Sequence, residues 1–347
     1  MDADGGVVGI GSLGLGGFGR QHLAAWAAVP EARVVAVADQ RPETLKEIGD
    51  RYGVSTQDAG LDELLAAPRV DAIDIVTPPE AHVEHALAAI AAGKHVFVEK
   101  PLAESTADAQ RVVDAARAAG VRLQVGLVSR FGVPYGLIKD QLDAGAFGDL
   151  VTIRAKRNIP QAWATHFQQA HPVYETAIHD LDLIVWYAGP RCLTAYAQHR
   201  RHLGLRHPDT FMALLGFESG VLVEVESTWH VPAGAPTGIM GAWDVGGIID
   251  AELEVIGTRQ TAKFSLADPG LTLWGSRTSF QPEIHLFPTL HGQTGGAIRD
   301  ELRHFVATVR SGQDSLVAPA QDAVATLRIA DAILRSAETG QVVRLEP

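Results

Sequence analysis

Short apolar runs alternate with longer stretches of helical periodicity along the first third of the chain. The runs are rich in β-branched residues, as in buried strands, whereas the stretches between them repeat apolar positions every three or four residues, as in amphipathic helices. The pattern predicts strands at residues 7–11, 33–38, 71–77, 95–98 and 122–126, and helices from about 20, at 62–65, around 81–87 and at 107–119. Such alternation predicts an α/β domain built on a doubly wound parallel sheet.

The pattern changes after residue 127, where several strands follow one another with short turns between them. We expect helices at 135–144 and 173–187, then strands, and two closing helices at 296–311 and 320–339. The strands are expected at 150–157, 193–199, 210–217, 221–228, 251–256, 261–265 and 271–274. Runs of strands of this kind predict an α+β domain with a large open antiparallel sheet. The sequence therefore predicts two domains, at residues 1–126 and 127–347.

Composition and charge narrow the class of protein. Hydrophobic residues make up 46% of the 347 positions and charged residues 20%, as in globular proteins. The net charge of −12 argues against a nucleic-acid partner, because phosphate binding needs basic patches. No apolar run reaches the roughly 18 residues of a membrane span, and the N-terminus lacks the basic start of a signal peptide. With Cys192 as the only cysteine, we expect a cytoplasmic protein without a disulfide or a membrane partner.

Three glycines, Gly14, Gly16 and Gly19, lie between the first predicted strand and the first predicted helix. In this context the first glycine allows a tight turn, the second lets the backbone approach a pyrophosphate, and the third lets the helix pack closely on the strand. The helix start supplies free N–H groups for the phosphates. Asp39 follows the second strand, 39 − 19 = 20 residues after Gly19, where an acid binds the adenosine ribose. Asp39 favours NAD, while the nearby Arg41 leaves NADP open.

A second motif, Glu99-Lys100-Pro101, ends the strand predicted at 95–98. Pro101 lacks a backbone donor and favours an extended conformation at Lys100. Ligands bind at the carboxyl edge of an open parallel sheet, so Lys100 is positioned to meet a bound substrate. Taken alone, the tripeptide also fits a surface Lys-Pro turn.

Thr77, Pro78 and His82 leave the same edge of the predicted sheet, after the strand at 71–77. A proline at a helix start is routine, and His82 also fits a surface helix position. We nevertheless expect this loop beside the cofactor. The predicted cofactor-binding residues are Gly14, Gly16, Phe18, Gly19, Asp39, Thr77, Pro78, His82, Glu99 and Lys100.

The helix predicted at 173–187 carries Glu175, His179 and Asp182 at i, i+4 and i+7. This spacing lines up two carboxylates and an imidazole on one face, which suits proton transfer. A partly buried helix with a satisfied histidine is the competing interpretation. No second histidine follows on this face, so we expect no metal site. The absence of a Gly-x-Ser-x-Gly motif argues against a serine nucleophile.

Together these motifs resemble the glucose–fructose oxidoreductase / inositol dehydrogenase / rhizopine catabolism (Gfo/Idh/MocA) family over nearly the whole chain. The similarity is closest at 76–79 with His82, at 92–102, at 178–182 with Trp186, and at the closing stretch 336–343. The resemblance implies an N-terminal Rossmann domain and a C-terminal α/β domain whose open sheet forms homodimers or homotetramers in many members. It also implies NAD(P)-dependent oxidation of a secondary hydroxyl of a sugar or cyclitol, or the reverse reduction.

By position in the family motifs, Lys100 is the motif lysine and His179 the motif histidine. Glu175 stands where many polyol dehydrogenases of the family carry aspartate, and it reaches one methylene further, which weakens any transfer of substrate identity. During oxidation a hydride passes to nicotinamide C4 while the hydroxyl proton passes to a base. A histidine with an ordinary pKa of about 6.5 suits neutral pH better than a lysine at about 10.4. We expect His179 to be the base, Lys100 to stabilise the same oxygen, and Glu175 to accept from a neighbouring hydroxyl or from His179.

Further substrate contacts are expected from Arg157, Trp163 and His166, which precede the catalytic helix. Packing is the alternative for the tryptophan, and solvent exposure for the other two. Arg130-Phe131 is expected to border the cofactor cleft. Two other functions fit the same motifs: NAD-assisted glycoside cleavage through transient oxidation and elimination, and a cofactor-binding regulator without chemistry.

Overall fold

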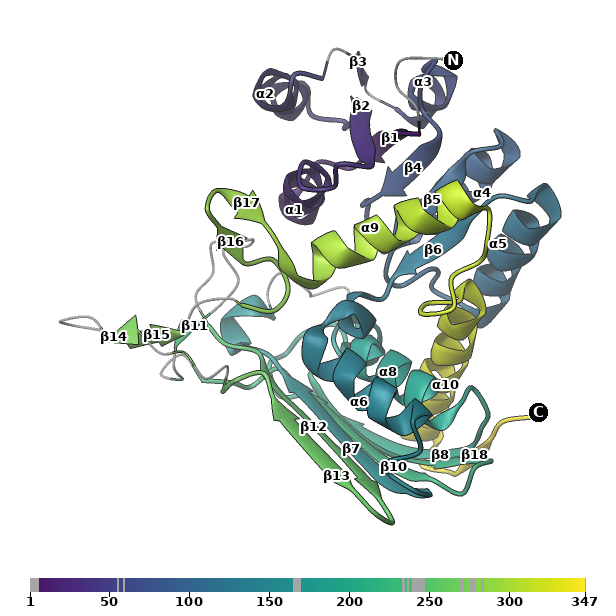
Figure 1. Cartoon of the computed structure of the whole chain (residues 1–347). Coiled ribbons are helices and arrows are strands. Elements are labelled where there is room, and N and C mark those ends of the chain that lie inside the picture. The colour runs from purple at the N-terminus through teal and green to yellow at the C-terminus, as the bar shows by residue number, and fades with distance from the viewer. Residues whose placement is uncertain are drawn as a thin grey trace. The chain divides into compact units, whose positions relative to one another are not determined.

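The computed structural model describes residues 6–54, 56–58, 60–164, 170–232, 235, 237–238, 247–268, 271, 273–274, 279–281 and 284–346. The chain divides into two compact units. Unit 1 comprises residues 1–131 and 285–324, and unit 2 comprises residues 132–284 and 325–347. Figure 1 labels their elements.

Unit 1 alternates strands and helices, as the periodicity predicted. Its elements are β1 (Val8–Leu13), α1 (Gly17–Trp26), β2 (Ala32–Ala38), α2 (Pro42–Tyr52), β3 (Thr56–Asp58), α3 (Leu61–Ala66), β4 (Ala72–Ile75), η1 (Pro79–Ala81), α4 (His82–Ala91), β5 (His95–Glu99), α5 (Thr106–Ala119), β6 (Leu123–Gly126), η2 (Val128–Phe131), β16 (Thr289–Leu290), β17 (Gln293–Thr294) and α9 (Gly296–Ser311).

Six of these strands form one parallel sheet in the order β3-β2-β1-β4-β5-β6. Helices α1 and α9 pack together on one face, and α4 and α5 pack together on the other (Figure 1). The buried ring of Phe97 in β5 meets Phe305 of α9 edge-on, with 5.7 Å between ring centroids. Local signals set the helix ends: Ser105 accepts a hydrogen bond from the Asp108 N–H at the start of α5, and Gly120 follows its end at φ 68°.

Unit 2 is built on a second sheet. Its elements are α6 (Val133–Asp143), β7 (Leu150–Asn158), η3 (Gln161–Trp163), α7 (Pro172–Glu175), α8 (Ile178–Ala188), β8 (Cys192–Arg200), β9 (Thr210–Phe217), β10 (Leu222–Thr228), β11 (Thr237–Gly238), β12 (Asp250–Gly257), β13 (Thr261–Ser265), β14 (Leu273–Trp274), β15 (Ser279–Gln281), β18 (Val343–Arg344) and α10 (Ala320–Thr339), whose residues 320–324 belong to unit 1.

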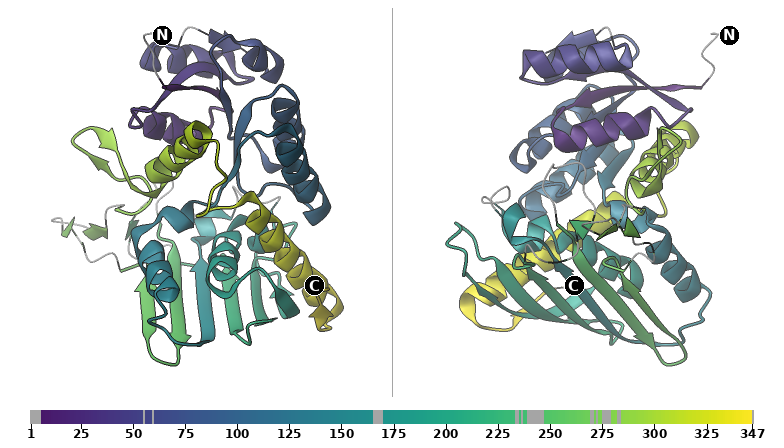
Figure 2. Two further views of the ribbon diagram at one scale, coloured as in Figure 1. Left: turned by 45° about the vertical axis from the view of Figure 1, so that its right-hand side comes forward. Right: turned by 90° about the vertical axis from the view of Figure 1, so that its left-hand side faces the viewer.

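Seven strands of unit 2 pair in the order β13-β12-β7-β10-β9-β8-β18. All neighbours are antiparallel except β7 and β10, which run parallel. Side chains alternate along each strand, and the inward set packs with α8 and the later turns of α10 in one apolar core. Figure 2 shows helices along this side of the sheet in two further views. The predicted fold class, a doubly wound parallel sheet plus a large, mostly antiparallel sheet, is confirmed.

The return of residues 285–324 to unit 1 differs from the single boundary expected near residue 127. Helix α9 has the predicted bounds, but its apolar face packs on the parallel sheet through Phe305. An amphipathic pattern identifies a helix and its buried face. Which sheet that face packs on is determined by contacts between residues distant in the sequence, which the local pattern does not contain. Among the described residues, no helix is both long and apolar enough to cross a membrane.

Candidate active site

The glycine turn lies between β1 and α1, at the carboxyl edge of the parallel sheet. Gly14 has φ +91°, a conformation that side chains rarely adopt. A Cβ on Gly16 would have no atom within 4 Å, so its backbone is open to a ligand. A Cβ on Gly19 would lie 2.0 Å from the Gly14 carbonyl oxygen, so only glycine lets α1 approach the turn this closely. Helix α1 starts at Gly17, earlier than the predicted start near Arg20, and its first N–H groups have no side-chain cap.

Asp39 lies just after β2 with 9% of its surface exposed. One carboxylate oxygen accepts the Leu15 N–H at 2.8 Å, which ties β2 to the glycine turn. The Arg41 guanidinium donates to both oxygens at 2.9 Å. Burial acts to raise the pKa of Asp39, but these hydrogen bonds outweigh it and hold the pKa below its usual value. An ionised acid stands where the sequence predicted a ribose ligand, and the open turn and helix start fit a dinucleotide.

His82 is buried, with 1% exposure, so the surface interpretation is wrong. Its Nδ1 lies 2.7 Å from the Pro101 carbonyl oxygen, and its Nε2 lies 2.8 Å from the Thr77 carbonyl oxygen. His82 thus joins the loop after β4 to the loop after β5. Its expected action on the cofactor remains a prediction, and the geometry favours an indirect one, through the loops that carry Thr77 and Pro78.

Glu99 ends β5 as a buried carboxylate, and the partly exposed Lys100 follows it. The Lys100 backbone N–H donates to Glu99 Oε2 at 3.1 Å, and the Lys100–Pro101 peptide bond is cis. Glu99 Oε1 lies 3.2 Å from Nε2 of His22 in α1. His22 was not predicted as a site residue. The second partner of His22 is Asp74, a charged residue within the otherwise apolar strand β4. A charged residue in such a strand indicates a buried polar contact, and this was the signal in the sequence.

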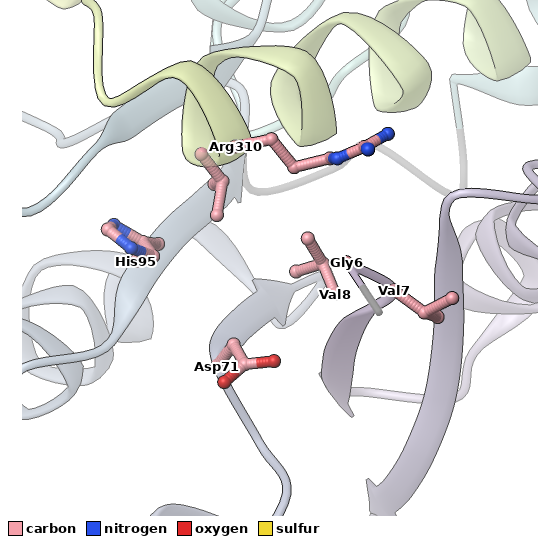
Figure 3. A pocket seen from close by; sticks show the side chains of 7 residues that line it. Gly6, Val7, Val8, Asp71, His95 and Arg310 are labelled. Atoms are coloured by element: carbon pink, nitrogen blue, oxygen red, sulfur yellow. The ribbon is translucent and has the colours of Figure 1, made fainter. Parts of the chain in front are cut away.

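Figure 3 shows a pocket in unit 1 that is not this site. Val8, Asp71 and His95 line it from the starts of β1, β4 and β5, with Arg310 from α9. It therefore opens at the amino edge of the parallel sheet, opposite the edge that carries Gly14 and Lys100.

In unit 2 the predicted continuous helix at 173–187 is wrong. The chain forms α7 and α8 with a break at Thr176, whose hydroxyl donates to the Pro172 carbonyl oxygen at 2.8 Å. The Ala177 N–H bonds to the same carbonyl, which widens the turn. A threonine hydroxyl that competes for a backbone acceptor disturbs a helix in this way. Glu175 therefore ends α7, while His179 lies in the first turn of α8.

The sequence predicted that Asp182 shares one helix face with Glu175 and His179. This prediction is wrong. Asp182 is fully buried at 0% exposure, whereas the other two side chains are partly exposed. The predicted carboxylate–imidazole–carboxylate face is therefore reduced to Glu175 and His179. A histidine and a carboxylate on adjoining turns still suit proton transfer.

Arg157 is buried at the end of β7, so solvent exposure, the alternative for this side chain, is excluded. Its guanidinium donates to both oxygens of buried Asp180 at 2.8 and 2.9 Å. Burial acts to lower the pKa of Arg157, but Asp180 and Tyr135 outweigh it and raise the pKa above its usual value. Asp180 adjoins His179 in α8, so the pair fixes the helix turn that carries the histidine.

Trp163 is 3% exposed and packs with Ile159, Ala164 and Trp229, as the packing alternative supposed. Its contact with substrate remains a prediction. His166 lies outside the described residues. Arg130 is buried within unit 1, where it donates to the Val317 carbonyl oxygen and to Asp322 at 2.8 Å.

The Phe131 ring packs at a tilt on the His304 ring, with 5.3 Å between ring centroids.

Among the described residues no three His, Cys, Asp or Glu side chains group to hold a metal ion.

These features define unit 1 as an NAD-binding Rossmann domain and the protein as an NAD-dependent oxidoreductase. Residues 8–127 match the model described as "Oxidoreductase family, NAD-binding Rossmann fold", and residues 135–263 match the Gfo/Idh/MocA C-terminal domain. The chain belongs to the Gfo/Idh/MocA family, and the family predicted from the motifs is confirmed.

Relatives named as inositol 2-dehydrogenases align over nearly the whole chain. The inositol 2-dehydrogenase of Burkholderia cenocepacia (strain HI2424) is 30% identical over 341 residues, which cover 96% of this chain and 95% of that protein. Inositol 2-dehydrogenase 3 of Saccharopolyspora erythraea is 29% identical over 342 residues, with 97% and 95% covered. The crystal structure of Lactobacillus casei scyllo-inositol dehydrogenase with NAD(H) and scyllo-inositol has a TM-score of 0.80 at 22% identity, covering 97% of this chain and 98% of that one. This structural similarity shows that the two chains share a fold.

Proposed function

We propose that the protein is a dehydrogenase that oxidises a secondary carbinol of a cyclitol or a related sugar with NAD, and reduces the ketone in reverse. The observation that carries the proposal is the presence of both Lys100 and His179 in a chain whose inositol 2-dehydrogenase relatives align over 95% of their own length. A regulator that only binds the cofactor has no need of this lysine and histidine.

The chain's own residues supply proton transfer and charge stabilisation. When bound, NAD accepts a hydride at C4 of its nicotinamide. The His179 imidazole takes the proton from the substrate hydroxyl oxygen in oxidation and returns it in reduction. The Lys100 ammonium donates a hydrogen bond to the same oxygen and stabilises its growing negative charge. Glu175 accepts a hydrogen bond from a neighbouring hydroxyl or from His179.

Arg157 and Asp180 support this role of His179 from within unit 2. Their bidentate pair is buried beneath the first turn of α8, so His179 is presented from a rigid element. We assign Arg157 to positioning through Asp180, because its guanidinium is already engaged. Precise placement of a proton acceptor matters, since an error of about 1 Å can cost about 100-fold in rate.

NAD is proposed over NADP because Asp39 remains ionised. Its carboxylate would accept hydrogen bonds from the ribose hydroxyls and repel a 2′-phosphate. Arg41 is paired with Asp39, so it is not available to neutralise that phosphate without leaving its partner.

A homodimer or homotetramer is proposed through the outer face of the unit 2 sheet. Met212, Leu214, Leu222 and Val151 are 44–63% exposed on strands whose alternate residues are buried. Exposed apolar side chains on a sheet face fit an interface between copies of the chain. Light scattering of the wild type and of Leu214→Glu tests this, and a wild-type monomer would overturn it.

The central test measures NADH formed from cyclitols, monosaccharides and glycosides. Net NADH from a free cyclitol or sugar is expected. Glycoside cleavage without net NADH would establish the elimination mechanism instead, and cofactor binding without turnover of any substrate would establish a regulator. The same assay with NADP is expected to be slower.

Variants at the two proposed residues test the mechanism. Lys100→Ala and His179→Asn should each lower kcat by about 100- to 10,000-fold, with NAD binding retained in calorimetry. Lys94→Ala is the matched control, because Lys94 lies before β5 and donates to the Val70 carbonyl oxygen. Substitutions at two residues that act on the same oxygen have non-additive effects on kcat. The double variant should therefore be little slower than either single variant. Fully multiplicative losses would mean that Lys100 and His179 act at separate places.

A further inference from the structure

A buried ionic cluster lies inside unit 1, directly below the carboxyl end of β5. His22 of α1 stands between two carboxylates from adjacent strands: its Nδ1 lies 3.0 Å from Asp74 Oδ1, and its Nε2 lies 3.2 Å from Glu99 Oε1. His22 is 1% exposed, Asp74 0% and Glu99 7%. Three such groups are rarely placed together in a core without a partner for each charge.

Two further donors complete the Asp74 side of the cluster. Trp26 Nε1 donates to Asp74 Oδ2 at 2.8 Å, and Ser12 Oγ donates to the same oxygen at 3.4 Å. The His22 ring is enclosed by Phe18 and Phe97, whose centroids lie 5.1 and 5.6 Å away. Asp74 is thus held by donors from two elements, α1 and β1, and its contact with His22 holds the imidazole in place.

The charge of the cluster follows from its geometry. Burial alone would favour a neutral imidazole, but the Asp74 and Glu99 carboxylates outweigh it and raise the pKa of His22 to about 10. The ring is therefore a cation near neutral pH. It contacts Glu99 as an ion pair rather than as a well-aligned hydrogen bond.

Glu99 passes this constraint to Lys100. Its Oε1 faces His22, and its Oε2 accepts the backbone N–H of Lys100 at 3.1 Å. Gly126 of the neighbouring strand β6 leaves room for the carboxylate, because a Cβ there would lie 2.4 Å from Oε1. A chain of contacts therefore runs from β4 through α1 to the residue that the proposed function places at the reacting hydroxyl.

We propose that His22 is a positioning residue, which holds the Glu99 carboxylate between α1 and β5 and thereby fixes the backbone of Lys100. This role rests on the proposed function for its effect on turnover, but not for its effect on the backbone. Buried ion pairs are weak sources of stability compared with apolar packing, and their better attested use is to specify one arrangement. Here the specified arrangement is that of the Glu99 carboxylate and, through it, of the Lys100 backbone that follows β5.

The direct test is amide hydrogen exchange at Lys100 in the full-length protein. Pro101 has no N–H, so the difference between two peptides with the same start, one ending at residue 99 and one at residue 101, reports the Lys100 amide alone. His22→Gln should raise the Lys100 exchange rate on the order of tenfold, as expected when a hydrogen bond to a charged group is loosened. His95→Gln is the matched control: His95 begins the same strand at its other end, and its Nδ1 accepts the Arg122 N–H at 2.9 Å.

Glu99→Gln provides a second variant should His22→Gln not fold. It keeps the length of the side chain but removes the charge that attracts His22, so Lys100 exchange should rise as well. Unchanged Lys100 exchange in a folded variant of either kind would overturn the proposal. An equal rise in His95→Gln would also overturn it, because the effect would then be general loosening of β5.

Turnover gives the second readout. His22→Gln should lower kcat about 10- to 100-fold, since Lys100 is displaced, while the dissociation constant for NAD changes by less than roughly threefold. The control should leave both unchanged. If the wild type turned over no substrate, the proposed function would fail, whereas the exchange result would still decide the role of His22.

Discussion

Two alanine substitutions in the glycine turn separate cofactor binding from folding. In Gly19→Ala the new Cβ would lie 2.0 Å from the Gly14 carbonyl oxygen, so α1 and the turn must move apart by at least about 1 Å. Both atoms belong to the backbone, and no side-chain rotation relieves the contact. Overpacking of this kind costs about 3 kcal/mol at its upper end, and alanine returns about 1 kcal/mol of helix propensity. Unit 1 should therefore lose about 2 kcal/mol of stability.

Gly16→Ala should have the opposite profile. Its φ of −66° suits alanine, and no atom lies within 4 Å of the new Cβ, so stability should change by less than about 1 kcal/mol. The methyl group would nevertheless occupy the space through which a pyrophosphate reaches the start of α1. Losing one hydrogen bond to a charged group costs about 1.5 to 3 kcal/mol, so NAD affinity should fall at least about tenfold.

Calorimetric unfolding without cofactor and isothermal titration with NAD measure the two effects separately. Gly53→Ala is not a suitable control, because Gly53 has φ +66° and would add strain of its own. Wild-type NAD affinity in Gly16→Ala would show that the phosphates do not approach this turn. Wild-type stability in Gly19→Ala would refute the packing argument.

Three further predictions concern charged groups. The pKa of His22 is about 10 in the folded protein against about 6.5 when unfolded, so its stabilisation is complete below pH 6.5 and decreases as the pH rises towards 10. Between pH 7 and 9 the free energy of unfolding of the wild type should fall by about 1.4 kcal/mol per pH unit relative to that of His22→Gln, as measured by denaturation. Parallel plots of unfolding free energy against pH for the two proteins would contradict this. Asp39→Asn removes the charge that repels a 2′-phosphate and releases Arg41, so titration should show the NADP to NAD affinity ratio rising about tenfold. Arg157→Met leaves Asp180 as an unpaired buried charge and should cost about 3 to 5 kcal/mol in thermal unfolding, with partial recovery on adding Asp180→Asn.

Regular elements were predictable because short-range patterns determine them. The sequence predicted α9, β9 and β13 with their observed bounds, since apolar periodicity marks all three and glycines mark both ends of α9. The break at Thr176 was not predicted. Apolar positions at helical spacing continue through it, whereas the helix is interrupted by hydrogen bonds from the Thr176 hydroxyl and the Ala177 N–H to the Pro172 carbonyl oxygen.

The candidate site was predictable where motifs mark single residues. Gly14 and Gly19 have the tight turn and the close helix packing that the spacing of the three glycines predicted. Asp182 was assigned to the wrong surface, because a polar residue on a helix was taken as accessible. His22 was missed, because its two partners come from other elements and only the fold brings them together.

The course of the chain between the units limits how the protein can be dissected. The backbone passes between them at residues 131/132, 284/285 and 324/325, and α9 reaches the parallel sheet only on the return. A fragment ending at residue 131 would lack α9, and with it the Phe305 ring that packs on Phe97 of the sheet. No single cut therefore yields two self-sufficient halves, and a shortened cofactor-binding protein would need residues 285–324 rejoined to it.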